Sequence, residues 1–591
     1  MLALVVGGAG VMLSPASACW AHAQLLGTSP AVGSTVSTQP REVIFEFDQN
    51  VGGTLGAVRV YDAQGSEVDD LDVSHPDGDE RWMGVGLKPH LPDGTYTATY
   101  RVISADTHIV YGGLVFNIGH AGVAPRYTVA SLVERNRTGK VTSVVFGAVR
   151  ALNYLAIAVT IGGLLFAVAI WPGVLVACAS SEQRWHAASH AFASRLRRLL
   201  YAAAALGFAT SALGVLLQGA SAAGVSLWSS VQGSVLETTL RSRFGEVWSA
   251  RAVDWVLLAL VFALGRVLRA DAIPALGTDS EVGRVRQPPI ATVLLLAAGC
   301  LYLGIAPALA GHASVESPVG VFLPADALHV LAASVWVGGV VCLLLALPAA
   351  TKQLEGGERT QLLLAALARF SPVALACVLA IALTGTIQAY IDVRSLHGLA
   401  STAYGSLVIA KTLLLLALAG LGWINRERIV PVLRTIVAGG RSPGATGVLT
   451  RRVLRVESAL MLVVFTVTAV LVAYAPPIDA ASGPYSTSTH IGEADLEITV
   501  EPANAGPNTI HLYLIDAKTG AQFTATRELT VTARLPAKGI GPLTLKANVA
   551  GPGHYVLDSA VLSPAGTWSI EIVDRVSEFE EHTSAIEVPI R

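Results

Sequence analysis

Three residues near the start of the chain are of types that bind transition metals. Asp106 and His108 are two positions apart, and in a β-strand such residues point to the same side. His22 would become the N-terminal residue if a secretory leader were removed after Ala21. Its free amine and its imidazole could then chelate one ion together. Nitrogen ligands with a carboxylate suit square-planar or tetragonal Cu(II), so the three residues form a candidate Cu(II) site.

Residues 1–21 have the composition of that leader, with an apolar run followed by small residues. A positively charged start is missing, which indicates a translation start further upstream. Cleavage after Ala21 would create the amine chelate at His22, whereas cleavage after Ala18 would not. The leader alone does not decide between them.

The composition predicts a membrane protein. Of the 591 residues, 52% are hydrophobic and only 14% are charged, against about 25% charged in soluble proteins. About 20 apolar residues span a bilayer, and eight such segments occur, near 149–176, 198–219, 251–269, 289–310, 322–348, 370–391, 405–425 and 453–475. The net charge of −2, with no block of Lys and Arg in the flanks, argues against a nucleic-acid partner.

The distribution of positive charge predicts the orientation. Arg and Lys concentrate in the first, third, fifth and seventh connections between the apolar segments. The positive-inside rule places these connections in the cytoplasm and both termini outside, in agreement with a cleaved leader.

Both flanks read as extracytoplasmic β-domains. Residues 22–120 and 478–591 contain short alternating runs separated by turn signals, which is typical of immunoglobulin-like sandwiches. Residues 121–148 are interpreted as a tether and residues 149–475 as an all-α bundle of about eight helices. Neither β-domain retains a cysteine after leader removal, so neither depends on a disulfide.

The first flank resembles the CopC copper-binding proteins over nearly all of residues 22–118. The resemblance is carried by His22-Ala-Gln-Leu, by Ser-Ala-Asp106-Thr-His108 and by Gly112-Gly-Leu-Val-Phe116. It implies that the mature N-terminal His and the Asp-x-His pair hold Cu(II). Some members also have a Met-rich Cu(I) site, but this domain contains only Met83, so we expect that site to be absent.

The apolar region resembles the CopD family, mainly over residues 300–425. The matching motifs are Gly311-His312-Ala313, His329 with Trp336-Val-Gly338-Gly339, Arg369-Phe370-Ser371, Thr384-Gly385, and Tyr404-Gly405 with Leu407 and Lys411. Fused CopC–CopD chains are implicated in copper import, homeostasis and resistance, and some end in a small β-domain. The resemblance implies a non-enzymatic protein of the bacterial plasma membrane, with copper ions and other copper-handling proteins as partners.

Ionisable residues within a span usually face a cavity or a partner. His312, at the predicted outer mouth, and His329, about 10 Å below it by helix rise, are therefore candidate copper contacts. Lys411 either snorkels or pairs with a carboxylate such as Asp326. Trp336 shares a helix face with His329; together with Gly338 and Gly339 we interpret it as close helix packing.

Three sulfur residues lie at a similar predicted depth. Cys342, Cys377 and Met461 are each near 10 Å from the cytoplasmic face. Thiolate and thioether favour Cu(I), so these residues extend the candidate path inward from the histidines and would require a reduction step. The plain alternative is that Cys and Met are ordinary apolar filler.

Three other functions remain open at this point. The bundle could merely anchor a domain that sequesters copper. It could hold haem and carry electrons, although His312, His329 and His397 all lie toward the outer side and do not pair at two depths. Copper held by an N-terminal His could also activate oxygen, against which the small domain and the anionic Asp106 argue.

No nucleotide-binding Gly-rich loop occurs. The C-terminal histidines lack ligand spacing and are interpreted as surface residues: His490, His511, His554 and His582.

Overall fold

The chain divides into two compact units, a helical unit made chiefly of residues 140–218 and 239–477 and a β-rich unit made chiefly of residues 20–139 and 478–591. The computed structural model describes residues 23–590 except 24, 32, 54–55, 105–108, 121, 123–124, 128, 136–139, 177–181, 224–227, 229–230, 265–288, 475, 477–484, 502 and 519–521. The leader predicted at 1–21 therefore lies outside the described residues.

The first β-domain is a sandwich of two four-stranded sheets, as predicted. One sheet has the order β1 (Leu25–Ser29), β3 (Glu42–Phe47), β6 (Trp82–Leu87), β5 (Asp69–Ser74), and the other the order β2 (Thr35–Val36), β8 (Ile109–Ile118), β7 (Gly94–Ile103), β4 (Val58–Tyr61). Alternation along β3 buries Val43, Phe45 and Phe47, because successive side chains of a strand point to opposite faces. The rings of Phe45 and Phe47 pack on Tyr100 of the other sheet, so the core is formed from both sheets.

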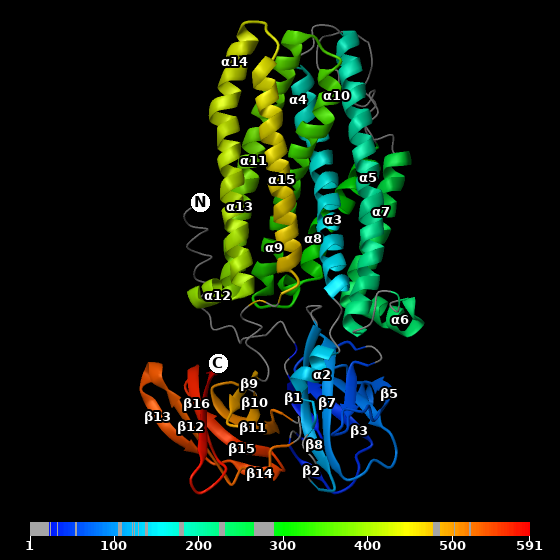
Figure 1. The fold of residues 1–591 in the computed structure, drawn as a ribbon. Helices are drawn as coiled ribbons and strands as arrows, with labels where there is room; N and C mark the ends of the chain where they lie inside the picture. The colour runs from blue at the N-terminus through cyan, green and yellow to red at the C-terminus, as the bar shows by residue number, and fades with distance from the viewer. Residues whose placement is uncertain are drawn as a thin grey trace. The chain divides into compact units, whose positions relative to one another are not determined.

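The C-terminal domain, orange to red in Figure 1, is a second two-sheet sandwich. A five-stranded sheet has the order β14 (Asn548–Gly551), β15 (His554–Leu562), β11 (Gly506–Asp516), β10 (Ala494–Glu501), β9 (Tyr485–Ile491), and a four-stranded sheet has the order β13 (Ile540–Leu545), β12 (Glu528–Leu535), β16 (Gly566–Arg575), β17 (Glu581–Ile590). Leu512 and Trp568, one from each sheet, are fully buried between them.

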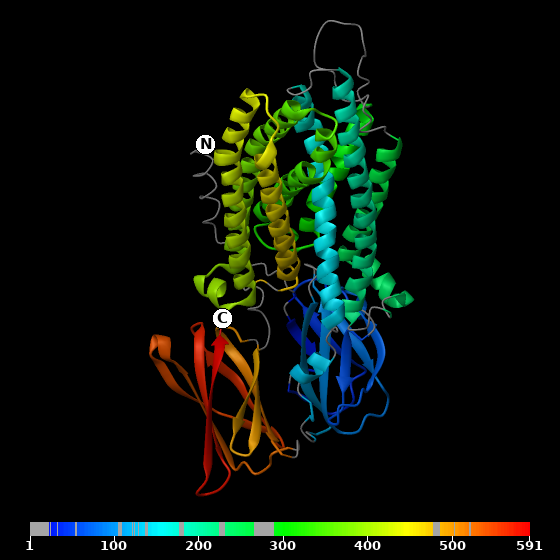
Figure 2. The same cartoon turned by 45° about the horizontal axis from the view of Figure 1, so that its top comes forward.

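Eight helices of the described chain are long and apolar enough to cross a membrane, which confirms the predicted number of spans. Figures 1 and 2 show them side by side in one bundle. They are α3 (Lys140–Leu165) with α4 (Trp171–Val176), α5 (Glu182–Ala223), α7 (Arg243–Leu264), α8 (Ile290–Leu309), α9 (Val319–Val341) with α10 (Leu347–Thr351), α11 (Gly356–Val393), α13 (Ala403–Ile424) with α14 (Val430–Ala438), and α15 (Gly444–Leu471). Three short helices are α2 (Val129–Arg135), α6 (Gly233–Arg241) and α12 (Leu396–Ser401).

The first span starts earlier than its apolar run, because α3 begins at Lys140 and not near residue 149. The segment predicted as a tether at 121–148 thus contains α2 and the first turns of α3.

Three of the spans contain a π-helical turn, at 166–170, 342–346 and 425–429. Each turn is followed by a proline at the second position of the next helical segment, at Pro172, Pro348 and Pro431. Proline donates no backbone hydrogen bond and clashes with the carbonyl four residues earlier. A wider turn accommodates that clash without ending the helix.

Glycines allow the backbones of α3 and α9 to touch. A Cβ atom added at Gly338 would lie 2.3 Å from the carbonyl oxygen of Ala158 and 2.6 Å from the Cα of Gly162. One added at Gly339 would lie 2.1 Å from the ring of Phe370 on α11. Small residues at such crossings are typical of helix association in membranes.

We therefore expect Gly338→Ala to destabilise the protein by about 1–3 kcal/mol, the usual effect of overpacking a site that cannot relax. Gly420→Ala is the matched control, because its Cβ would meet nothing within 4 Å and alanine favours the helix. Thermal unfolding of the detergent-solubilised chain measures both. Equal melting temperatures for the two variants would contradict the close contact.

Candidate functional site

The described residues that flank the candidate Cu(II) ligands are joined to one another. Strands β7 and β8 pair antiparallel, and their pairing ends at Ile103 with Ile109, one on each side of the sequence segment 104–108. The backbone N–H of Ala23 donates to Ser104 Oγ over 2.9 Å, and both residues are 3% exposed. This bond ties the residue that follows position 22 to the residue that follows β7. His22, Asp106 and His108 themselves lie outside the described residues.

Met83 is part of the hydrophobic core of the first domain. It is 1% exposed on β6, and its Cε lies 2.8 Å from the position of a Cβ at Gly53. The thioether fills space between the two sheets, which is a common use of Met.

In the helical unit, His329 of α9 is fixed by α11. Its Nδ1 lies 3.0 Å from Thr384 Oγ1, and the same hydroxyl donates to the carbonyl of Ala380 over 2.7 Å. A Thr hydroxyl has one proton. While it donates that proton to the Ala380 carbonyl, its oxygen accepts a hydrogen bond from His329 Nδ1. The His329 ring then carries its proton on Nδ1 and presents a lone pair at Nε2, the form that ligates metals.

A charged side chain of α13 interacts with this histidine. Lys411 is half-buried and interacts electrostatically with His329, Asp326 and Asp392. Asp392, 5% exposed, accepts a 2.6 Å hydrogen bond from the Tyr404 hydroxyl. These interactions place Lys411 within electrostatic range of Asp326 and Asp392.

A further carboxylate belongs to the loop that precedes α9, near the end of the bundle where α9 begins. Glu316 is 1% exposed, and its Oε1 lies 3.8 Å from an Arg394 nitrogen. Its backbone N–H donates to the carbonyl of His312, whose side chain is half-buried. Sequence reasoning missed Glu316 and Asp392, because each follows or precedes an apolar run rather than interrupting one.

The three sulfur residues are buried in the main core of the bundle. Cys342, Cys377 and Met461 belong to one hydrophobic cluster that extends through α3, α9, α11 and α15. No group of three or more His, Cys, Asp or Glu side chains suited to a metal occurs among the described residues.

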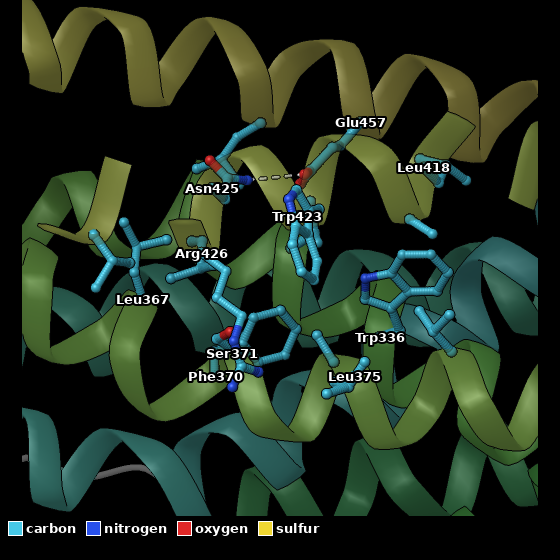
Figure 3. Close-up of a pocket in the computed structure, with 18 of the residues that line it drawn as sticks. Trp336, Leu367, Phe370, Ser371, Leu375, Leu418, Trp423, Asn425, Arg426 and Glu457 are labelled. Carbon is cyan, nitrogen blue, oxygen red and sulfur yellow. Dashed lines mark hydrogen bonds between the residues drawn. The ribbon is translucent and has the colours of Figure 1, made fainter. Parts of the chain in front are cut away.

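A cavity of about 400 Å³ lies between α9, α11, α13 and α15 (Figure 3). Its wall is largely apolar and aromatic, with Trp336, Phe370 and Trp423 around it. At its polar end the Asn425 amide donates to Glu457 Oε1 over 2.9 Å. Trp336 follows His329 by two helical turns, about 10 Å along α9. Trp336 both lines this cavity and packs in the core of the bundle.

Two histidines of the C-terminal domain correct the sequence interpretation. His490 and His582 are accessible and lie beside carboxylates, whereas His511 and His554 are buried and in contact with each other. They are 43 residues apart, and only the register of β11 against β15 brings them together.

Three family models match the chain. Residues 25–119 match the CopC domain, residues 141–321 the copper resistance protein D-like N-terminal domain, and residues 364–471 copper resistance protein D. The copper transport protein CutJ of Bacillus subtilis (strain 168) is 28% identical over 575 residues, which cover 95% of this chain and 94% of CutJ. Protein YobA of Escherichia coli (strain K12) is 26% identical over 99 residues, covering 17% of this chain and 80% of YobA.

Two solved structures are similar to the first β-domain. CopC from Methylosinus trichosporium OB3b is 26% identical and covers 16% of this chain and 93% of its own, with a TM-score of 0.14. PcoC, a methionine-rich copper resistance protein from Escherichia coli, is 25% identical and covers 17% of this chain and 99% of its own, with a TM-score of 0.15. The family matches and the likeness to CutJ along almost the whole chain agree with the motifs in both regions. The chain thus joins a CopC domain to a membrane region of the copper resistance protein D type.

Proposed function

We propose that this protein captures Cu(II) outside the cell at its CopC domain and passes copper inward through the helical bundle. The observation that carries the first half is the hydrogen bond between Ala23 and Ser104. It joins the residue after His22 to Ser104, which precedes Asp106 by two positions and His108 by four. An amine, two imidazoles and a carboxylate meeting there would supply the tetragonal donor set that Cu(II) prefers. The proposal includes leader cleavage after Ala21 and extracytoplasmic termini.

The second half is supported by the surroundings of His329. The Thr384 hydroxyl orients the ring and favours a lone pair at Nε2, as a hydrogen-bond partner of a metal-ligating histidine does. Asp326 and Asp392 supply negative charge, which lowers the cost of bringing a cation into the membrane. Lys411 neutralises part of that charge while no cation is present.

From His329 the proposed route continues along α9. His312 would receive copper at the entrance, His329 would hold it within the bundle, and the face of α9 that bears Trp336 leads to the cavity (Figure 3). Cys342, Cys377 and Met461 would take Cu(I) beyond that point. Their burial in an apolar cluster is equally compatible with packing, so separate variants must test the two halves.

The CopC-domain site predicts selective loss of Cu(II) binding. Asp106→Ala and His108→Ala should each lower the Cu(II) affinity of the full chain by at least tenfold, because each removes a direct ligand. His90→Asn is the control: His90 is exposed in the same domain, and Asn tolerates its positive φ of 61°. Competition with a chromophoric chelator measures the affinity. Wild-type affinity in both site variants would remove this site, as would a mature protein that does not begin at His22.

The tautomer argument predicts that Thr384 acts through His329. Thr384→Val removes the acceptor for His329 Nδ1 at almost constant volume and should reduce copper uptake severalfold. Thr384→Ser keeps the hydroxyl and should retain uptake, while His329→Ala should abolish it. Time courses of cellular copper, normalised to protein in the membrane, measure all three. Equal uptake by the Val and Ser variants would contradict the orienting role.

The sulfur half of the route makes its own prediction. Cys342→Ser and Cys377→Ser, singly and together, should reduce copper uptake if thiolates carry Cu(I) through the inner half of the bundle. Cys300→Ser is the matched control, because Cys300 lies in another membrane helix, α8, and is only half-buried. Normal uptake in the double variant, with uptake lost in His329→Ala, would limit the route to its histidine half.

A further inference from the structure

The cavity between α9, α11, α13 and α15 combines an aromatic, apolar wall with one polar end. Its volume of about 400 Å³ lies within the range of sites that hold a small organic molecule. Trp336, Phe370 and Trp423 contribute rings to the wall, and such rings favour a flat aromatic occupant by stacking. Trp423 and Leu375 also line it and are 67% and 48% exposed. The cavity therefore reaches the outer surface of the bundle, where a lipid-soluble molecule can enter from the bilayer.

The polar end of the cavity offers hydrogen-bond acceptors. Asn425 and Glu457 point toward each other (Figure 3), and the Asn425 amide donates to Glu457 Oε1 over 2.9 Å. Asn425 Oδ1 is buried and has no hydrogen-bond partner in the part of the chain that the structure describes. Buried polar atoms are normally paired, so this oxygen indicates a missing donor. An ionised carboxylate likewise only accepts hydrogen bonds. A ligand that fits the whole cavity thus combines a flat ring with O–H or N–H donors.

The proposed copper route supplies a reason for such a ligand. Passage from Cu(II) at the outer site to Cu(I) at thiolates requires one electron for each ion. Trp336 follows His329 by about 10 Å along α9, and Met461 follows Glu457 by about 6 Å along α15. The cavity, which Trp336 and Glu457 line, is therefore close to both the histidine and the sulfur positions of the route. Among ring compounds with O–H donors, hydroquinones with an apolar tail are both lipid-soluble and reducing.

We propose that this cavity binds a quinol, which reduces copper during its passage through the bundle. The inference rests on the proposed function, because it names the reductant that the change from Cu(II) to Cu(I) requires. The quinol ring lies among the aromatic side chains of the wall. One of its hydroxyls donates to the Asn425–Glu457 pair, and its apolar tail extends past Leu375 to the lipid.

The redox step balances with two copper ions. One quinol gives one electron to each of two Cu(II) ions, which yields one quinone, two Cu(I) ions and two protons. The Glu457 carboxylate accepts the proton of the hydroxyl that donates to it, and the second proton leaves through the same carboxylate once the first has passed to water. Arg426 and Glu427 line the polar end with side chains that are 48% and 51% exposed, so water reaches this end. The quinone then returns to the bilayer.

The first test measures binding to the copper-free, full-length protein in detergent. The probe is heptyl-hydroxyquinoline N-oxide, a quinol analogue whose fluorescence is quenched when it binds to a protein. We expect one equivalent to bind. Glu457→Gln replaces an acceptor oxygen by a donor and should weaken binding at least tenfold, and Ala419→Phe should abolish binding by filling the cavity. Glu246→Gln and Ala417→Phe are the controls, because both residues are exposed and neither lines the cavity.

Three results of this titration would overturn the site. They are no binding to the wild type, wild-type binding by Ala419→Phe, and displacement of the probe by a phospholipid as effectively as by decylubiquinol. The last result would mean that the cavity holds a lipid chain. Because the titration contains no copper, its failure would remove the quinol site and leave copper uptake to test the proposed function.

A second test measures the electron transfer. Protein loaded anaerobically with decylubiquinol is mixed with Cu(II), and formation of the quinone is followed by its ultraviolet absorbance. The wild type should form one quinone for every two Cu(II) ions and faster than free decylubiquinol does, whereas Ala419→Phe should show only the rate of the free quinol. His329→Ala should bind the probe normally and lose the acceleration. Binding without acceleration in the wild type would contradict the reducing role of the quinol.

Discussion

A bilayer provides no water for ionisable side chains, and this constraint shapes the membrane half of the protein. Asp326, Asp392 and Lys411 come from three different helices and interact within the bundle. Isolated charges are costly in a medium of low dielectric, so it is favourable that these opposite charges interact with one another. His329 lies within this arrangement, and Thr384 sets its orientation. The proposed route uses this polar centre as the place where a cation would be held.

The backbone contact between α3 and α9 supports that centre from one side. Gly162 and Gly338 bring the two helices together four residues after Ser334, whose hydroxyl is satisfied within α9. Gly339 receives the ring of Phe370, which also lines the cavity. Small residues therefore position the helix that carries His329, while the aromatic residues next to them shape the space beyond it (Figure 3).

Much of this architecture could be predicted from composition and periodicity. Eight apolar runs predicted eight helices, because the thickness of a bilayer fixes the length of a span. The ends of the helices were harder to predict. Helix α3 extends back to Lys140, because hydropathy does not detect polar turns that continue a helix beyond the membrane. The His511–His554 pair was missed for a related reason. Strand register determines which distant residues meet, and the sequence shows no local ligand spacing there. Thr384 stood in a recognisable motif, but its role follows only from its two hydrogen bonds.

The central claim is that copper crosses the membrane through this chain and is not only held at its surface. The most direct test compares cells with and without the protein after copper exposure and a wash with a membrane-impermeant chelator. Copper that resists the wash should be higher in cells that contain the protein, and His329→Ala should return it to the level of cells without the protein. If the wash removes all of the additional copper, the bundle is an anchor for sequestration and the account of transport is wrong.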